Sequence, residues 1–174
     1  MNGLKYSPRR CVYAGSFDPV TLGHVDVIVR GATLFDHVTV GIGVNPDKQP
    51  LFTADQRRAL LREVLVDVPN VSVEFFSGLT VDFVREQGAS VMLRAIRTVS
   101  DMDSEFNLAL ANQTLAPDLE TVFLMASDRF SHVSSSMIKQ VAQLAGPNCA
   151  EQLRHFVPEA VIRPLIERSQ GTLR

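Results

Sequence analysis

The feature that most constrains the fold of this chain is a regular alternation of short apolar runs with amphipathic stretches. The apolar runs are rich in Val, Leu, Ile or Phe, which is the composition of buried strands. They predict β-strands at residues 10–15, 37–44, 71–76, 91–94 and 121–125. Each run is followed by a stretch whose apolar residues have helical spacing, so the order is strand, helix, strand, helix.

The amphipathic stretches predict the helices. One apolar stripe comprises Val25, Ile28, Val29, Ala32 and Phe35, and a second comprises Leu60, Leu61, Val64, Leu65 and Val68. Thr53 and Gln56 have the spacing of a capping box ahead of the second stripe. Further helices are predicted at residues 79–87 (with Gly88 as the end), 100–115, 136–144, 151–156 and 158–168.

This alternation favours an α/β fold. We predict a Rossmann-like, doubly wound, five-stranded parallel sheet with helices on both faces and a helical C-terminus. The 174 residues fit a single domain, residues 1–174, and we expect residues 1–9 and 169–174 to be poorly ordered.

Composition excludes several classes of protein. The apolar content of 45% and charged content of 21% are those of a globular protein, and no apolar run is long enough for a membrane span. A net charge of −2 argues against nucleic-acid binding. The N-terminus lacks a secretory signal, and Cys11 and Cys149 form no metal-ligand pattern, so we expect a cytoplasmic protein.

Polar residues follow the predicted strands. In an open α/β sheet, ligands bind beyond the carboxyl ends of the strands, where the strand order reverses. Those ends carry hydroxyls and the cations Lys48, Arg94, Arg97 and Arg129. Because the whole chain is slightly acidic, cations concentrated at this edge predict a polyanionic ligand, most simply phosphates.

The segment YAGSFDPVTLGH, residues 13–24, joins the first strand to the first helix. Gly15 lets backbone approach a ligand, Ser16 offers a hydroxyl, and the helix start at Thr21 is expected to present amides to an anion. Neither GxGxxG nor GxxxxGK[ST] occurs, so this is another kind of phosphate site.

Each of these residues also has a structural interpretation. Thr21 is equally suited to capping the helix, with His24 in its first turn. The run Ser134–Ser136 is suited to an N-cap, and Lys48 and Arg97 to solvated surface positions. Their coincidence at one edge of the sheet favours the functional interpretation.

Four separated motifs, YAGSFDPVTLGH, NPDKQPLFT, LRAIRTVSD and VSSSMIK, give the chain a family resemblance. From about residue 11 to residue 165 it resembles the bacterial phosphopantetheine adenylyltransferases of the [HT]xGH nucleotidyltransferase superfamily. The resemblance implies transfer of the adenylyl group of ATP to 4′-phosphopantetheine, giving dephospho-coenzyme A and pyrophosphate in coenzyme A biosynthesis. It also implies Mg²⁺ as cofactor and a homohexamer.

The resemblance assigns roles by position. His24 corresponds to the histidine that stabilises the transition state. The residues matching 4′-phosphopantetheine contacts are Ser16, Lys48, Thr80 and Arg94. The residues matching ATP contacts are Ser16, Phe17, His24, Ala95, Ile96, Arg97, Glu105, Phe130, Ser131, His132, Val133, Ser134, Ser135 and Ser136.

The sequence departs from the family pattern on the adenine side. Ala95 stands where glycine is usual, Phe130 replaces Trp or Tyr, and His132 replaces a frequent phenylalanine. We therefore expect activity with altered adenine contacts. Two alternatives stay open: a sister nucleotidyltransferase that uses another phosphate acceptor, such as nicotinamide mononucleotide, and a non-catalytic adenine-nucleotide sensor.

Overall fold

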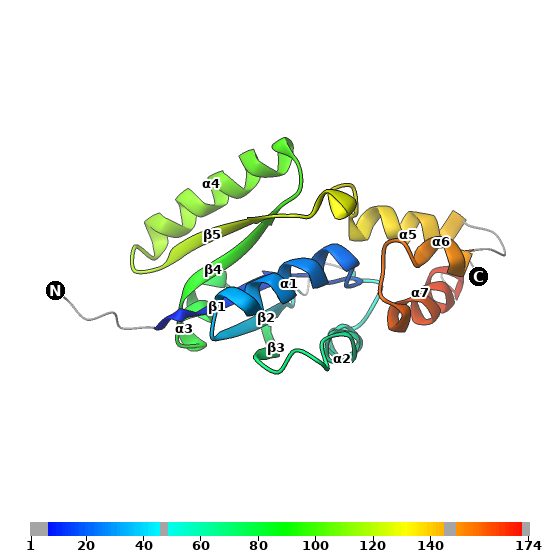
Figure 1. Cartoon of the computed structure of the whole chain (residues 1–174), viewed down its shortest axis with the longest axis horizontal. Helices are drawn as coiled ribbons and strands as arrows, with labels where there is room; N and C mark the ends of the chain where they lie inside the picture. Colours follow the sequence, from blue (N-terminus) through cyan, green and yellow to red (C-terminus); the bar gives the residue numbers. More distant parts are fainter. Residues whose placement is uncertain (1–6, 46–48, 145–148, 172–174) are drawn as a thin grey trace.

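The computed structural model describes residues 7–45, 49–144 and 149–171 (Figure 1). Its centre is a five-stranded sheet in the order β3-β2-β1-β4-β5, and every neighbouring pair of strands is parallel. The strands are β1 (Ser7–Gly15), β2 (His37–Gly43), β3 (Val71–Phe76), β4 (Ala89–Ile96) and β5 (Glu120–Met125). The predicted α/β class and strand count are confirmed.

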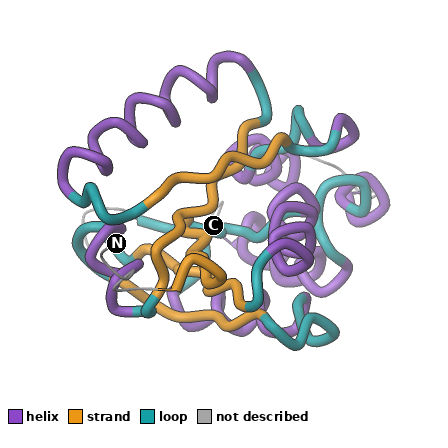
Figure 2. Tube along the Cα trace, turned by 60° about the vertical axis from the view of Figure 1, so that its left-hand side comes forward, coloured by secondary structure: helices purple, strands orange, loops and turns teal. Residues whose placement is uncertain are grey.

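Helices cover both faces of the sheet, as a doubly wound fold requires. They are α1 (Leu22–Leu34), α2 (Ala54–Val64), α3 (Thr80–Glu86), α4 (Val99–Leu115), α5 (Ser135–Leu144), α6 (Cys149–Leu153) and α7 (Glu159–Gly171), with a 3-10 turn η1 (Asp128–Phe130). The larger buried cluster joins the sheet to α1, α2 and the C-terminal helices, and the smaller joins it to α3. Figure 2 shows the strands between the long helix α4 and the group of C-terminal helices.

Most predicted boundaries shift by one to three residues. β1 begins at Ser7 and α7 reaches Gly171, so residues 7–9 and 169–171, expected to be poorly ordered, belong to regular elements. α2 ends at Val64, although the apolar stripe continues to Val68. Pro69 disfavours helical backbone at Val68, so the helix cannot follow the stripe to its end. Among the described residues, no helix has the length and apolarity needed to cross a bilayer.

The strand order reverses between β1 and β4. The chain runs outward from β1 to β2 and β3, and then returns to the other side of β1 for β4 and β5. Tyr13 of β1 is in register with Leu93 of β4, so the carboxyl ends of these two strands lie side by side. The loops that leave them diverge, which opens the crevice that the fold class predicts at such a switch point.

A buried carboxylate holds together the loops around this crevice. Asp18 is 5% exposed, and it accepts hydrogen bonds from the amides of Leu51 and Phe52, both at 2.9 Å. Its Oδ2 also pairs with the Lys139 ammonium at 3.1 Å. Because Lys139 belongs to α5, this one side chain ties the loop after β1 to the segment before α2 and to α5.

Arg57 of α2 complements this carboxylate. The side chain is 4% exposed, and its Nη1 donates to the carbonyl oxygens of Ser16 at 2.7 Å and Gly43 at 3.2 Å. Burial lowers the pKa of Arg57, and the charge of Asp18 partly offsets that shift. The guanidinium thus fixes the spacing between the carboxyl ends of β1 and β2.

We expect Asp18→Asn to lower the free energy of unfolding by about 2–4 kcal/mol, because it leaves buried donors without their acceptor. Asp36→Asn is a matched control. Asp36 pairs with Arg9 at the surface, where the two side chains are 58% and 74% exposed, and its loss should cost less than about 1 kcal/mol. Urea denaturation measures both, and equal stability of the two variants contradicts the role of Asp18.

Candidate active site

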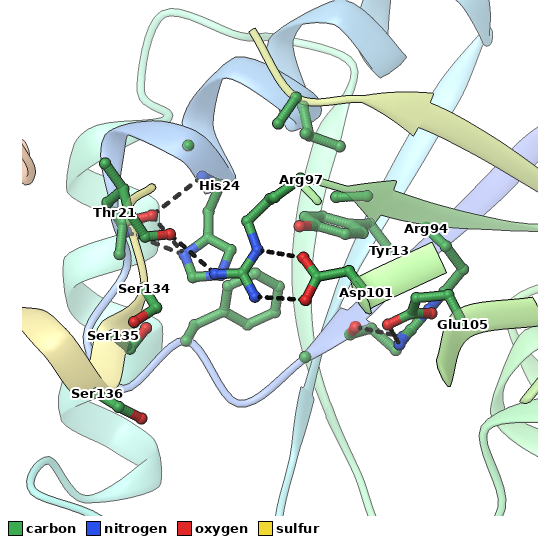
Figure 3. Close-up of a pocket in the computed structure, with 18 residues that line it drawn as sticks. Tyr13, Thr21, His24, Arg94, Arg97, Asp101, Glu105, Ser134, Ser135 and Ser136 are labelled. Atoms are coloured by element: carbon green, nitrogen blue, oxygen red, sulfur yellow. Dashed lines mark hydrogen bonds and ion pairs between the residues drawn. The ribbon is translucent and has the colours of Figure 1, made fainter. Parts of the chain in front are cut away.

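A cavity of about 320 Å³ lies at the carboxyl ends of β1 and β4 (Figure 3). Its wall is formed by the loop after β1, the start of α1, the end of β4, two carboxylates of α4 and the start of α5. The lining residues are Tyr13, Ala14, Gly15, Phe17, Thr21, Gly23, His24, Val27, Arg94, Ala95, Arg97, Asp101, Glu105, Ala126, Val133, Ser134, Ser135 and Ser136.

Thr21 and His24 form a capping box at the start of α1. The Thr21 hydroxyl accepts from the His24 amide at 3.2 Å, and the His24 Nδ1 accepts from the Thr21 amide at 3.1 Å. A nitrogen that accepts an N–H bond carries no proton, so the neutral ring must carry its proton on Nε2. The structural and functional interpretations of this pair are therefore compatible, because the cap itself orients the imidazole.

The surroundings of His24 keep it neutral. Its ring packs edge-on against Phe17, with ring centroids 5.1 Å apart. Burial, and after it the positive charge of Arg97, lower the pKa of His24 from 6.5 to about 4. At neutral pH the ring is therefore a donor through Nε2–H without a formal charge.

Arg97 lies beside this histidine and links two loops. It donates to Asp101 through Nε at 2.8 Å and Nη2 at 3.2 Å, and its Nη1 donates to the Val133 carbonyl at 2.9 Å. The guanidinium thus connects the end of β4 with the segment that precedes α5. Asp101 was not among the predicted site residues, although its position four residues after Arg97 is the spacing of a helical ion pair.

Arg94 is held in the same way. It donates to Glu105 through Nε at 2.6 Å and Nη2 at 2.7 Å, and to the Ala14 carbonyl through Nη1 at 3.2 Å. The resemblance assigns Arg94 and Glu105 to different substrates, and the structure brings them together as one pair. The charged lining of the cavity therefore comprises two guanidiniums and two carboxylates, both carboxylates on α4.

The first amides of α1 and of α5, the two helices that begin at the cavity, have different hydrogen-bond partners. At α1, the amides of residues 21 and 24 are used by the capping box, and the Leu22 amide donates to the Phe156 carbonyl at 2.8 Å. The expectation that this start presents its amides to an anion is therefore wrong for those three. At α5, the Ser134 hydroxyl caps the Met137 amide at 3.2 Å, and Ser134, Ser135 and Ser136 line the cavity.

Other predicted residues lie outside this cavity. Ser16 and Thr80 line a second, more open hollow of about 500 Å³ beyond the ends of β2 and β3, together with Asn45 and Phe76. Gly15 lines the first cavity and Ser16 the second, so the two hollows flank the end of β1. Lys48 lies outside the described residues.

The predicted adenine-side residues have mixed surroundings. Phe130 and Ile96 are buried at 8% and 6% exposure and do not line the cavity. Arg129 lies over the Phe130 ring, 4.5 Å from its centroid. The Ser131 hydroxyl donates to the Asp128 carbonyl, and His132 lies edge-on to Phe156. Ala95 and Val133 do line the cavity.

Comparison with known proteins supports the motif-based resemblance. The cytidylyltransferase-like family model matches residues 12–141. The phosphopantetheine adenylyltransferase of Rhodopirellula baltica is 51% identical over 94% of this chain and 89% of its own length. That of Caldanaerobacter subterraneus is 46% identical, over 92% of this chain and 97% of its own length. The chain belongs to the phosphopantetheine adenylyltransferase family.

Solved structures support the fold of this phosphopantetheine adenylyltransferase family member. Nicotinic acid mononucleotide adenylyltransferase of Plasmodium falciparum superposes with a TM-score of 0.67 at 14% identity, covering 95% of this chain and 98% of its own. A nicotinate-nucleotide adenylyltransferase of Vibrio parahaemolyticus gives 0.63 at 15% identity, covering 90% and 97%. At this identity the likeness concerns the fold alone.

The geometry of His24 predicts its titration. Nitrogen-15 NMR of the folded chain, assigned with a His24→Gln variant, should show a neutral Nε2–H tautomer from pH 8 down to about pH 5, with a pKa near 4. The unfolded chain takes up this proton near pH 6.5, so His24 lowers stability as pH falls from 6.5 and adds no further loss below about 4. An Nδ1–H tautomer, or a pKa near 6.5, contradicts this account.

Proposed function

We propose that this chain transfers the adenylyl group of ATP to 4′-phosphopantetheine, forming dephospho-coenzyme A and pyrophosphate. The observation that carries this proposal is the fixed, neutral imidazole of His24 in a cavity that it shares with Arg94, Arg97 and the start of α5. Relatives named phosphopantetheine adenylyltransferase, 42–51% identical over at least nine-tenths of the chain, support the substrate pair.

The reaction is an in-line displacement at the α-phosphorus. A phosphate oxygen of the acceptor forms the new P–O bond, and the bond from the α-phosphorus to the bridging oxygen of the β-phosphate breaks. Pyrophosphate leaves with that electron pair. The attacking oxygen is already anionic at neutral pH, so no side chain has to remove a proton from it. Catalysis then consists of positioning and of stabilising charge.

His24 supplies the donor at the reacting centre. Its Nε2–H donates to an α-phosphate oxygen, where negative charge shifts in the transition state. A neutral imidazole suits this task, because it gives a hydrogen bond and keeps its proton. The amides at the start of α5 and the hydroxyls of Ser134 and Ser136 bind the β- and γ-phosphates, whereas the Ser135 hydroxyl donates to the Pro19 carbonyl at 2.9 Å.

The acceptor occupies the second hollow and meets the nucleotide at the end of β1. Ser16 and Thr80 line that hollow, and we assign Lys48 and Arg94 to the acceptor phosphate. The Arg94 guanidinium is paired with Glu105, so a phosphate must share or replace that carboxylate. A dianionic phosphate carries more charge than one carboxylate and can accept from the same two parallel N–H groups of the guanidinium. It can therefore compete with Glu105 for Arg94.

Mg²⁺ remains a prediction from the resemblance. The described residues contain no group of three His, Cys, Asp or Glu side chains placed to hold a metal, and both cavity carboxylates are paired with arginines. This donor set fits a metal held by the triphosphate and water. When bound, the ion would neutralise charge on the leaving pyrophosphate.

The cytoplasmic location, which was expected from the sequence, also stays a prediction.

Purified chain incubated with ATP, Mg²⁺ and 4′-phosphopantetheine should release pyrophosphate, whereas nicotinamide mononucleotide as acceptor should not support release.

His24→Ala should lower turnover by on the order of 10²–10³-fold, because it removes one oriented donor, and ATP affinity by calorimetry should change little. His24→Gln keeps a Thr-x-x-Gln capping box like that of Thr53 and Gln56, and so controls for loss of the helix start. Unchanged turnover in both variants refutes the role of His24.

We also propose that the chain assembles as a homohexamer. α4 buries none of its residues, and it exposes Val99, Met102, Phe106 and Leu110 at 82%, 52%, 56% and 47%. These four recur at helical spacing and so form one apolar stripe. An exposed apolar stripe on a well-formed helix is typical of a protein interface. The number six rests on the family resemblance.

Light scattering should give a mass of six chains of 19.2 kDa. Phe106→Glu places a charge in the centre of the stripe, and should yield smaller species. Val66→Glu is the matched control, because Val66 is 76% exposed and lies outside α4. A wild-type monomer, or equal effects of the two substitutions, contradicts an interface on α4.

A further inference from the structure

Tyr13 is a cavity residue to which neither the resemblance nor the mechanism above gives a role. It belongs to β1, is 6% exposed and lines the nucleotide cavity. Its ring packs edge-on against Phe17 with centroids 5.6 Å apart, and lies 6.5 Å from the imidazole of His24. In Figure 3 its hydroxyl end is directed toward the side of the cavity where His24 and Arg97 lie.

The hydroxyl has no hydrogen-bond partner within the described part of the chain. The ring fills its place in the core, and a phenylalanine would fill that place equally well, because the in-register neighbours Val40 and Leu93 are apolar. Tyrosine hydroxyls in protein interiors usually find a partner, and this one is not among the fully buried unpaired atoms of the described residues, so it is open to the cavity. An unpaired hydroxyl at a cavity wall therefore points to a ligand that completes it.

The charges around the hydroxyl indicate the kind of ligand. Burial raises the pKa of Tyr13 to about 12, while Arg94 and Arg97 lower it and Glu105 raises it. The phenol is therefore a neutral donor at pH 7. Its cationic neighbours can accept nothing, and the two cavity carboxylates are each engaged by an arginine. An anionic oxygen drawn in by the guanidiniums is the acceptor that fits.

We propose that the Tyr13 hydroxyl donates a hydrogen bond to a phosphate oxygen of bound substrate, beside His24. This inference rests on the proposed function for the source of that phosphate, which is either the triphosphate of ATP or the phosphate of 4′-phosphopantetheine. The hydroxyl is then a third type of donor at the reacting phosphates, together with the imidazole and the guanidiniums.

Tyr13→Phe removes the hydroxyl and keeps the ring. We expect affinity for ATP or for 4′-phosphopantetheine, titrated separately by calorimetry, to fall on the order of 10–100-fold, as for a hydrogen bond to a charged group. Affinity for adenosine and for pantetheine, which lack the phosphates, should stay unchanged. Loss with ATP identifies the triphosphate as the source, and loss with 4′-phosphopantetheine identifies the acceptor.

Thermal unfolding separates this role from a structural one. Because the hydroxyl has no partner in the chain, Tyr13→Phe should not lower the melting temperature. Thr39→Val is the control. Thr39 is 2% exposed and lies outside the cavity, and its hydroxyl accepts from Ser72, so the substitution should leave both affinities unchanged. Unaltered phosphate-dependent affinity, an equal loss with adenosine, or a lowered melting temperature overturns the proposal. A wild-type chain that releases no pyrophosphate instead refutes the proposed function, while the ATP titration still tests Tyr13.

Discussion

The reciprocal hydrogen bonds between Thr21 and His24 are the interaction on which the site depends. They satisfy two amides at the start of α1, and they remove the proton from Nδ1. A Glu or Gln at this position would complete the same box. Histidine completes it through Nδ1 and presents a ring N–H on its far side, in the direction that the rigid imidazole fixes. The bonds that cap α1 therefore also orient the imidazole for its proposed role as a donor to the transition state.

The cavity is nearly neutral in charge, although it is suited to polyanions. Arg94 and Arg97 are each paired with a carboxylate of α4, and His24 is uncharged at pH 7. Two unpaired guanidiniums at a partly buried wall would be costly without ligand. The two carboxylates offset that cost and hold each guanidinium in position, so that a bound phosphate would meet oriented N–H donors. The same proximity explains why Arg97 helps to keep His24 neutral.

The sequence predicted the architecture and the edge of the sheet at which the site lies, because both follow from local periodicity and from the topology rule for parallel strands. It did not predict how the site is divided. Ser16 and Gly15 are neighbours in sequence, yet they line different hollows, and the chain turns directly after them at Phe17, whose φ is +49°. The pairing of Arg94 with Glu105 could not be predicted either, because it depends on where α4 lies over β4. Sequence also could not show that the Tyr13 hydroxyl has no partner in the described residues, because this depends on the position of every neighbouring side chain.

Helix α4 connects the chemistry to the surface of the molecule. It carries Asp101 and Glu105 toward the cavity and an apolar stripe on its exposed side, and none of its residues is buried. It is held by its packing over β4 and by its ion pairs with Arg94 and Arg97. In the proposed function, a phosphate that competes for Arg94 or Arg97 weakens these ion pairs, and in the proposed hexamer a second chain covers the stripe. In the proposed function and assembly, substrate binding and self-association both involve α4, so any coupling between them is reciprocal by linkage.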